Sequence, residues 1–333
     1  MSLRSVSGFE SYLDRWERHV GEAWGIGRDF RLPGSFRNIS HVLFCGIGGS
    51  AIGGDIVRVL FQSRAAVPFE VRRAGMGLPA WAGPRTLVVL SSYSGNTREI
   101  LEAFGEASKA GARILIVTSG GRLAKAALRK KIPWIKIPGG FQPRCAIVYL
   151  TIPILWVFKK AGLLPVAPGE IREAASIARK VSRSRARSLA RRLFSKNIHL
   201  YAASGTLEPV AVRWRTQLAE NAKTLASHNL MPEMFHNEIE AWQFPKGRMR
   251  DRAAVFFSDP EDPKVFGKKI KFAAAHIRRK GAGVIQLRPS GRGLLARIFS
   301  LILAGDWVSL ELARLYRADP TTIPVLDAVK KIG

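Results

Sequence analysis

The chain has 333 residues, 47% of them hydrophobic, and its 53 Lys and Arg against 25 Asp and Glu give a formal net charge of +28. This length and apolar content suit two domains, each with its own core. The two cysteines, Cys45 and Cys145, lie in apolar surroundings, without a Cys/His cluster. We therefore expect buried thiols in a cytoplasmic protein, with neither a disulfide framework nor a metal site. No apolar run reaches membrane-spanning length, and the charged N-terminus does not resemble a signal peptide.

The positive charge is concentrated between Arg122 and Lys196, where 18 basic residues stand against two acids. Such a field could attract nucleic acid, an anionic membrane or an anionic substrate. The chain has no zinc-finger or RNP-like motif and no interleaving of aromatic and basic residues. Specific nucleic-acid or membrane binding is therefore not expected, and steering of a phosphorylated substrate is the simpler use of this charge.

The first half of the chain predicts a helix followed by alternating strands and helices. An amphipathic pattern over residues 7–28 predicts one helix in an N-terminal segment, 1–35. Strand patterns follow at 40–45, 68–72, 86–91, 113–118 and 133–137, with helical patterns at 50–63, 96–110, 121–131 and 143–161. This alternation predicts a doubly wound parallel sheet over residues 36–165.

The second half begins with a basic stretch, Pro168–Phe194, which predicts one long helix in a linking segment, 166–195. Over residues 196–333 we expect strands at 197–203, 253–258 and 283–288, helices at 207–225, 263–280 and 293–317, and a tail helix at 322–331. The strand, turn and helix of 41–60 recur at 198–218, with a serine-glycine turn at Ser204–Thr206. A duplicated domain is indicated. The predicted fold class is α/β, with two doubly wound, flavodoxin-like parallel sheets and helices at both ends.

Two loops of the first half place glycines and hydroxyls directly after strands. FCGIGGSAIGGD (Phe44–Asp55) and SSYSGNT (Ser91–Thr97) each lead into a helix, whose free N–H groups favour a phosphate. Neighbouring strand ends of a parallel sheet border one crevice. Neither loop is a Walker A motif, and no acidic residue suits a dinucleotide ribose, so no nucleotide cofactor is expected. The candidate substrate-binding residues are Gly48, Gly49, Ser50, Ser92, Ser94 and Thr97.

These two loops, with PRCA (143–146), LAEN (218–221) and HNEI (236–239), resemble the archaeal bifunctional phosphoglucose/phosphomannose isomerase family. That family belongs to the sugar isomerase domain (SIS) superfamily, and the resemblance runs from about residue 40 to the C-terminus. It implies two sugar isomerase domains in a homodimer. It also implies reversible isomerisation of glucose 6-phosphate or mannose 6-phosphate to fructose 6-phosphate through a cis-enediol, without metal or cofactor.

The resemblance assigns roles as well. Glu220 matches the base, Arg144 the arginine that offsets charge on the intermediate, and His236 the histidine of ring opening, which in the family reaches the neighbouring subunit's crevice. Lys330 matches the lysine of ring opening, with Lys331 as the adjacent alternative. Thr321 and Thr322 are the two candidates for a small residue near C2 of the sugar.

Two alternatives stay open. A regulator could bind a sugar phosphate in the same fold and grip DNA with its basic surface, although fewer than about forty residues precede the first strand, too few for a helix-turn-helix domain beside one helix. An isomerase of amino-sugar phosphates would share the fold as well.

Overall fold

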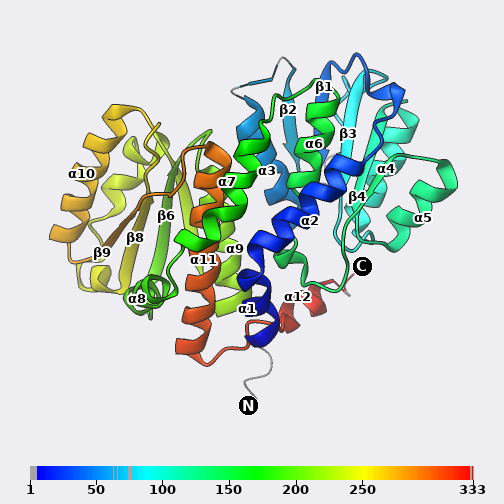
Figure 1. Cartoon of the computed structure of the whole chain (residues 1–333). Helices are drawn as coiled ribbons and strands as arrows, with labels where there is room; N and C mark the ends of the chain where they lie inside the picture. The colour runs from blue at the N-terminus through cyan, green and yellow to red at the C-terminus, as the bar shows by residue number, and fades with distance from the viewer. Residues whose placement is uncertain (1–5, 63, 66, 74–76, 331, 333) are drawn as a thin grey trace. The chain divides into compact units, whose positions relative to one another are not determined.

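The computed structural model describes residues 6–62, 64–65, 67–73, 77–330 and 332, and these form two compact units (Figure 1). The five-stranded unit is Trp16–Ala175, and the four-stranded unit is Ser176–Gly333 together with the N-terminal residues up to Arg15. Each unit contains one parallel sheet.

The sheet of the five-stranded unit has the order β2-β1-β3-β4-β5, with every pairing parallel. The unit's strands and helices are α2 (Trp16–Asp29), β1 (His41–Cys45), α3 (Gly49–Gln62), β2 (Phe69–Arg72), β3 (Thr86–Ser91), α4 (Arg98–Lys109), β4 (Arg113–Thr118), α5 (Gly121–Lys130), β5 (Trp134–Lys136), α6 (Ile152–Lys160) and α7 (Pro168–Ser176). In this flavodoxin-like order the direction of winding reverses between β1 and β3. The glycine loop after β1 and the serine loop after β3 therefore lie at the position where such sheets bind ligands.

Successive side chains of β1 point to opposite faces of this sheet, and both faces are covered by helices. Leu43 and Cys45 belong to a buried cluster with residues of α4 and α5. Phe44 points to the other face, where a Cβ on Gly54 of α3 would lie 2.4 Å from its ring. Burial raises the pKa of the Cys45 thiol to about 12, so that it stays protonated and unreactive.

The sheet of the four-stranded unit has the order β7-β6-β8-β9, again with every pairing parallel. Its elements are α1 (Val6–Asp14), α8 (Arg183–Leu193), β6 (Asn197–Ala203), α9 (Glu208–Ala222), β7 (Ala226–Met231), β8 (Arg252–Phe257), α10 (Lys264–Arg279), β9 (Gly283–Leu287), α11 (Leu294–Tyr316) and α12 (Pro324–Val329). The order repeats that of β2-β1-β3-β4, so both the predicted fold class and the duplication are confirmed. No helix of the described residues is long and apolar enough to cross a membrane.

Two predicted helices are each broken in the structure. The single helix expected over 7–28 is α1 and α2, separated at Arg15, because α1 packs on α11 whereas α2 packs on α6. The basic helix expected over Pro168–Phe194 is α7, a 3-10 turn (Ile177–Lys180) and α8. Val181 between them is extended, and the Ser182 hydroxyl accepts a hydrogen bond from the Arg185 N–H, which starts a new helix.

Three further predictions are corrected. The helix expected over 143–161 is a 3-10 turn (Pro143–Cys145), turns and α6, which begins at Ile152 because Pro153 fits only a first helical turn. The tail helix expected over 322–331 starts only at Pro324 for the same reason. Strand β7 was not predicted, since Ser227, His228 and Asn229 interrupt its apolar pattern and most of it is only partly buried.

Candidate active site

The serine loop after β3 brings two predicted hydroxyls together. Ser92 Oγ lies 2.8 Å from Thr97 Oγ1 and accepts a hydrogen bond from the Gly95 N–H at 3.1 Å. Ser92 is buried, and Thr97 is the N-cap residue of α4, although its side chain accepts no hydrogen bond from the helix start. The Thr97 hydroxyl therefore does not cap the helix itself, and a helix start of this kind favours a phosphate. Ser94 is exposed, and its hydroxyl accepts from the Asn96 N–H at 3.3 Å.

The serine loop is held in place by backbone contacts that the sequence did not reveal. Gly95 has φ +67°, and a Cβ there would lie 1.9 Å from the Gly120 carbonyl oxygen. The Tyr93 hydroxyl accepts a hydrogen bond from the Phe141 N–H at 2.7 Å, and burial raises the pKa of Tyr93. The aromatic residue in the motif thus joins the serine loop to the segment that precedes Arg144.

The glycine loop after β1 lies against the predicted arginine. A Cβ on Gly49 would lie 3.4 Å from the Pro143 carbonyl oxygen and 3.7 Å from Arg144 Cα. Arg144 is 3% exposed and Ser50 is also buried, whereas Gly48 takes the left-handed turn with φ +57°. A Cβ at position 49 would be in ordinary van der Waals contact with the turn that carries Arg144, so the two segments lie side by side. The structure therefore brings Gly48, Gly49, Ser50 and Arg144 into one neighbourhood.

The predicted base lies in the four-stranded unit, on the last turn of α9. Glu220 is partly buried there, two residues before the helix ends. The ammonium of Lys223 donates to the Glu220 carbonyl at 2.6 Å and to the Thr322 carbonyl at 2.7 Å. The helix end that carries Glu220 is thus joined to the loop that carries both threonine candidates. Thr321 donates its hydroxyl to Asp319 Oδ1 at 2.6 Å, whereas Thr322 is exposed.

His236 is exposed and follows a short 3-10 turn, in which its N–H donates to the Glu233 carbonyl at 2.9 Å. Two residues on, Glu238 anchors the segment to the sheet: its carboxylate accepts from the Tyr201 hydroxyl and from Asn229 Nδ2, each at 2.6 Å. Burial and the Glu238 carboxylate raise the pKa of Tyr201, so the phenol remains a donor. The acid of the HNEI motif therefore supports the loop that carries His236.

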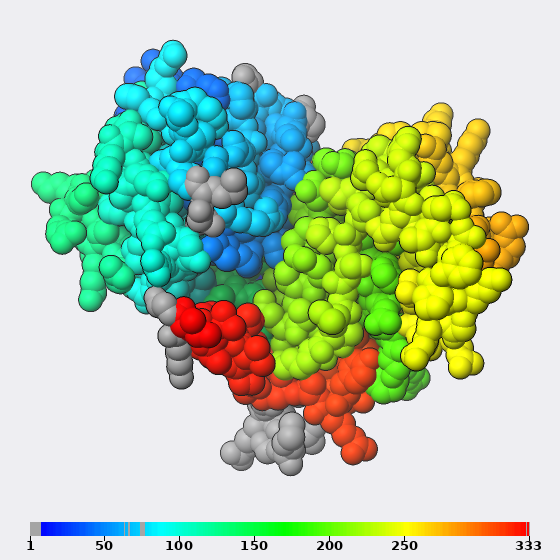
Figure 2. All heavy atoms as spheres, turned by 180° about the vertical axis from the view of Figure 1, so that it is seen from behind, coloured from blue at the N-terminus to red at the C-terminus, as the bar shows by residue number. Residues whose placement is uncertain are grey.

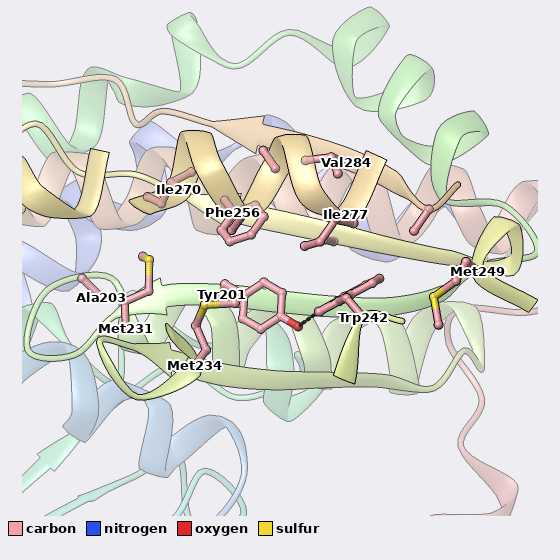
Figure 3. Close-up of a cluster of buried hydrophobic side chains, with 14 residues drawn as sticks. Tyr201, Ala203, Met231, Met234, Trp242, Met249, Phe256, Ile270, Ile277 and Val284 are labelled. Atoms are coloured by element: carbon pink, nitrogen blue, oxygen red, sulfur yellow. Dashed lines mark hydrogen bonds between the residues drawn. The ribbon is translucent and has the colours of Figure 1, made fainter. Parts of the chain in front are cut away.

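The residues beneath this loop form a closed core. Tyr201 also accepts a hydrogen bond from the Trp242 indole N–H at 3.0 Å (Figure 3). Both aromatic residues belong to a buried cluster with methionines of the neighbouring segments and residues of α10. Neither Tyr201 nor Glu238 was singled out from the sequence, because a tyrosine in an apolar strand is normally read as core.

The C-terminal candidate Lys330 lies on the surface. Lys330 caps α12, is exposed, and lies 3.6 Å from the Asp327 carboxylate. Figure 2 shows this C-terminal segment, in red, as an exposed surface. Lys331 lies outside the described residues. Among the residues that the structure describes, no three His, Cys, Asp or Glu side chains gather as a metal site.

Apart from Lys330, the predicted residues thus form four groups. The five-stranded unit brings the glycine loop together with Arg144 and, on the next strand, pairs Ser92 with Thr97. The four-stranded unit joins the helix end of Glu220 to the Thr321–Thr322 loop and holds His236 on a separate, anchored loop. The five-stranded unit thus contains a loop of the kind that binds phosphate, and the four-stranded unit contains a partly buried carboxylate of the kind that can serve as a base.

One solved structure and one protein-family model are similar to this chain. The C-terminal domain of glucosamine-fructose-6-phosphate aminotransferase from Francisella tularensis has the same fold: it matches with a TM-score of 0.72 at 13% identity, covering 92% of this chain and 96% of that chain. Residues 182–332 match the bacterial phospho-glucose isomerase C-terminal SIS domain. The fold is therefore that of this solved structure, and residues 182–332 are similar to a sugar isomerase (SIS) domain.

Curated relatives show the family to which the chain belongs. The chain is 36% identical to the bifunctional phosphoglucose/phosphomannose isomerase of Caldicellulosiruptor bescii, over 97% of both chains. The chain belongs to this family. It is 32% identical to the enzyme of the same name from Thermoplasma acidophilum, over 90% of this chain and 93% of the relative. It is also 30% identical to D-glucosamine-6-phosphate 4-epimerase of Sulfolobus acidocaldarius, over 70% of this chain and 72% of that protein.

Proposed function

We propose that this protein interconverts glucose 6-phosphate and mannose 6-phosphate with fructose 6-phosphate, by proton transfer through a cis-enediol. The observation that carries the proposal is the match to a bifunctional isomerase along 97% of both chains. The paired hydroxyls at the start of α4 support it, because all three sugars carry the same phosphate on C6, away from the carbons that react.

In the proposed mechanism, Glu220 removes a proton from one of the carbons C1 and C2 and returns it to the other. A partly buried carboxylate suits this task, and one base serves both directions. Arg144 offsets the negative charge that develops on the enediolate oxygens, an effect that is strong where water is largely excluded. Ser92 and Thr97, with Gly48, Gly49, Ser50 and Ser94 beside them, bind the phosphate.

His236 and Lys330 open the sugar ring in this proposal, by moving a proton between the ring oxygen and O1. Imidazole exchanges protons near neutral pH, and the exposed position of His236 leaves it open to a ligand. Either Thr321 or Thr322 lies near C2 and tolerates both orientations of its hydroxyl.

We further propose a cytoplasmic homodimer of central carbohydrate metabolism, in which His236 serves the site of the partner subunit. Glu220→Gln and His236→Ala homodimers, each inactive, are mixed under conditions that exchange subunits. If His236 acts in trans, each heterodimer contains one site with both defects and one with neither, so activity returns. A mixture that stays inactive after verified exchange contradicts the shared site.

The reaction itself is tested with purified protein in EDTA, by coupled assays that start from each of the three hexose 6-phosphates. Turnover of all three supports the proposal. The amino-sugar alternative is supported by the similarity to D-glucosamine-6-phosphate 4-epimerase. It is tested with glucosamine 6-phosphate, and with fructose 6-phosphate in the presence of ammonia or glutamine. Sugar-phosphate binding without turnover of any substrate would favour a regulator.

A further inference from the structure

Lys223 ends α9 in a backbone conformation that lysine seldom adopts. It has φ 55° and ψ 33°, the left-handed region in which helices usually place glycine at their ends. A side chain in this region crowds the following carbonyl group, a strain that glycine avoids. Such strain persists only where the surrounding structure favours it, and here the lysine side chain makes two hydrogen bonds.

The Lys223 ammonium connects two segments that lie 99 residues apart in the chain. It donates to the carbonyl of Glu220, in the last turn of α9, at 2.6 Å and to the carbonyl of Thr322, beyond α11, at 2.7 Å. One ammonium group thus donates hydrogen bonds both to a carbonyl at the C-terminal end of a helix and to a carbonyl in a loop. Hydrogen bonds with a charged donor are stronger than those between neutral groups. Glycine at this position could not make either bond.

The other side of α9 is fixed by buried polar contacts with α11. Arg213 donates to both carboxylate oxygens of Asp306, at 3.1 and 2.9 Å, and both side chains are almost fully buried. Two turns along α9, Asn221 Nδ2 donates to Ser309 Oγ at 2.9 Å. These bonds set the rotation of α9 as far as Asn221, and Lys223 adds a link from the end of the same helix to the threonine loop.

We propose that Lys223 is a positioning residue, which holds the Glu220 backbone and the Thr321–Thr322 loop at a fixed separation. It thereby sets both the rate of proton transfer and the preference between the C2 epimers. The inference rests on the proposed roles of Glu220 and of the threonine loop.

The chain offers a matched control for this test. Lys131 ends α5 with φ 54° and ψ 37°, and its exposed side chain makes no hydrogen bond within the part of the chain that the structure describes. Lys223→Met and Lys131→Met keep most of the unbranched side chain and remove its ammonium group in nearly the same backbone conformation. The difference between the two variants therefore isolates the bonds to the carbonyls of Glu220 and Thr322.

For Lys223→Met we expect about a tenfold lower kcat on both sugars, the effect of about 1.4 kcal/mol in the transition state, within the range of one charge-assisted bond. The mannose-to-glucose activity ratio should shift about threefold, and KM should stay within about twofold because the phosphate loop is untouched. Lys131→Met should resemble the unmodified protein. Lys223→Arg should recover part of the loss.

A second variant separates positioning from stability. Lys223→Gly relieves the backbone strain, so Tm should stay the same or rise while kcat falls. Unchanged kcat and epimer ratio in Lys223→Met and Lys223→Gly overturn the inference, as does a loss of kcat that only follows a fall in Tm. Glu220→Gln is measured beside them. If it is inactive while Lys223→Met is normal, this inference alone fails; if it retains full activity, the assignment of Glu220 as the base fails, and this inference loses its premise, while turnover of the three hexose 6-phosphates tests the proposed function separately.

Discussion

The two units have the same strand order but use the loops at its reversal point differently. In the five-stranded unit the loop from β3 to α4 carries hydroxyls and a glycine, with Ser92 and Thr97 paired at the helix start. The corresponding loop of the four-stranded unit, from β8 to α10, contains Ser258, Asp259, Glu261 and Asp262 instead. A phosphate favoured at the first loop would be repelled at the second.

The acidic loop is also occupied by the protein's own groups. Asp259 is 6% exposed and accepts a hydrogen bond from Arg297 Nε at 2.8 Å, and Arg297 is almost fully buried. Asp262 accepts from the Thr206 hydroxyl, which belongs to the serine-glycine turn after β6. The acidic loop thus holds a buried ion pair, while α9, the helix after β6, carries the candidate base. The comparison teaches that a shared topology fixes where a site can form, whereas the loop chemistry decides whether one does.

The largest effect is expected from Glu220→Gln, which tests the proposed base in the four-stranded unit. The amide keeps the shape of the side chain but cannot accept the proton, so kcat should fall about 10²–10⁴-fold on both glucose and mannose 6-phosphate. Substrate binding, measured by calorimetry, should stay within a few-fold. Glu208→Gln, on the first turn of the same helix, is the control and should remain active. If Glu220→Gln kept more than about a hundredth of the activity, the base would have to be sought elsewhere.

Asp259→Ala tests whether the acidic loop is structural. It leaves Arg297 buried with only the exposed carboxylate of Glu261 as a charged partner, and losing one partner of a buried pair costs about 3–5 kcal/mol. Denaturant unfolding should show this loss. Glu261→Ala removes the exposed partner of the same arginine and should cost at most about 1 kcal/mol. Equal losses in the two variants would contradict the interpretation that the acidic loop is structural.

Much of the fold was open to prediction because its signals are local. Strand β6 was predicted with its observed ends, and both reversal-point loops of the five-stranded unit follow apolar runs that are easy to recognise. Strand β7 was missed because a partly exposed strand needs no continuous apolar run. The break at Val181 was missed because the arginines around it favour a helix, and the Ser182 cap can be recognised only once the helix start is known.

The candidate site was predictable only in its residue types. Hydroxyls, glycines and a carboxylate can be recognised in short motifs, whereas the groups that hold them come from distant parts of the chain. Tyr201 is 37 residues from the Glu238 that it anchors, and Lys223 is 99 residues from Thr322. Contacts over such separations depend on the packing of the whole unit, and no local pattern records them.

Ser92→Ala and Thr97→Ala test the loop that we infer to bind phosphate. Each variant loses one hydrogen bond to a charged group that does not react, so binding weakens equally in the ground state and the transition state. KM for fructose 6-phosphate should rise about tenfold or more, while kcat changes by less than about threefold. Ser108→Ala serves as the control, because that hydroxyl only donates to the Phe104 carbonyl on α4. An unchanged KM in both loop variants would remove the phosphate assignment.

The smallest effect is expected from Thr206→Ala, the counterpart of these variants in the four-stranded unit. The Thr206 hydroxyl donates to Asp262 Oδ1 at 3.1 Å, and burial raises the pKa of that carboxyl. Its loss should cost about 1 kcal/mol of stability and lower Tm by a few degrees. KM for all three hexose 6-phosphates should stay within about twofold, because this turn faces an ion pair and not a phosphate. A tenfold rise in KM here would mean that both units contact the phosphate, and the contrast between the two crevices would be lost.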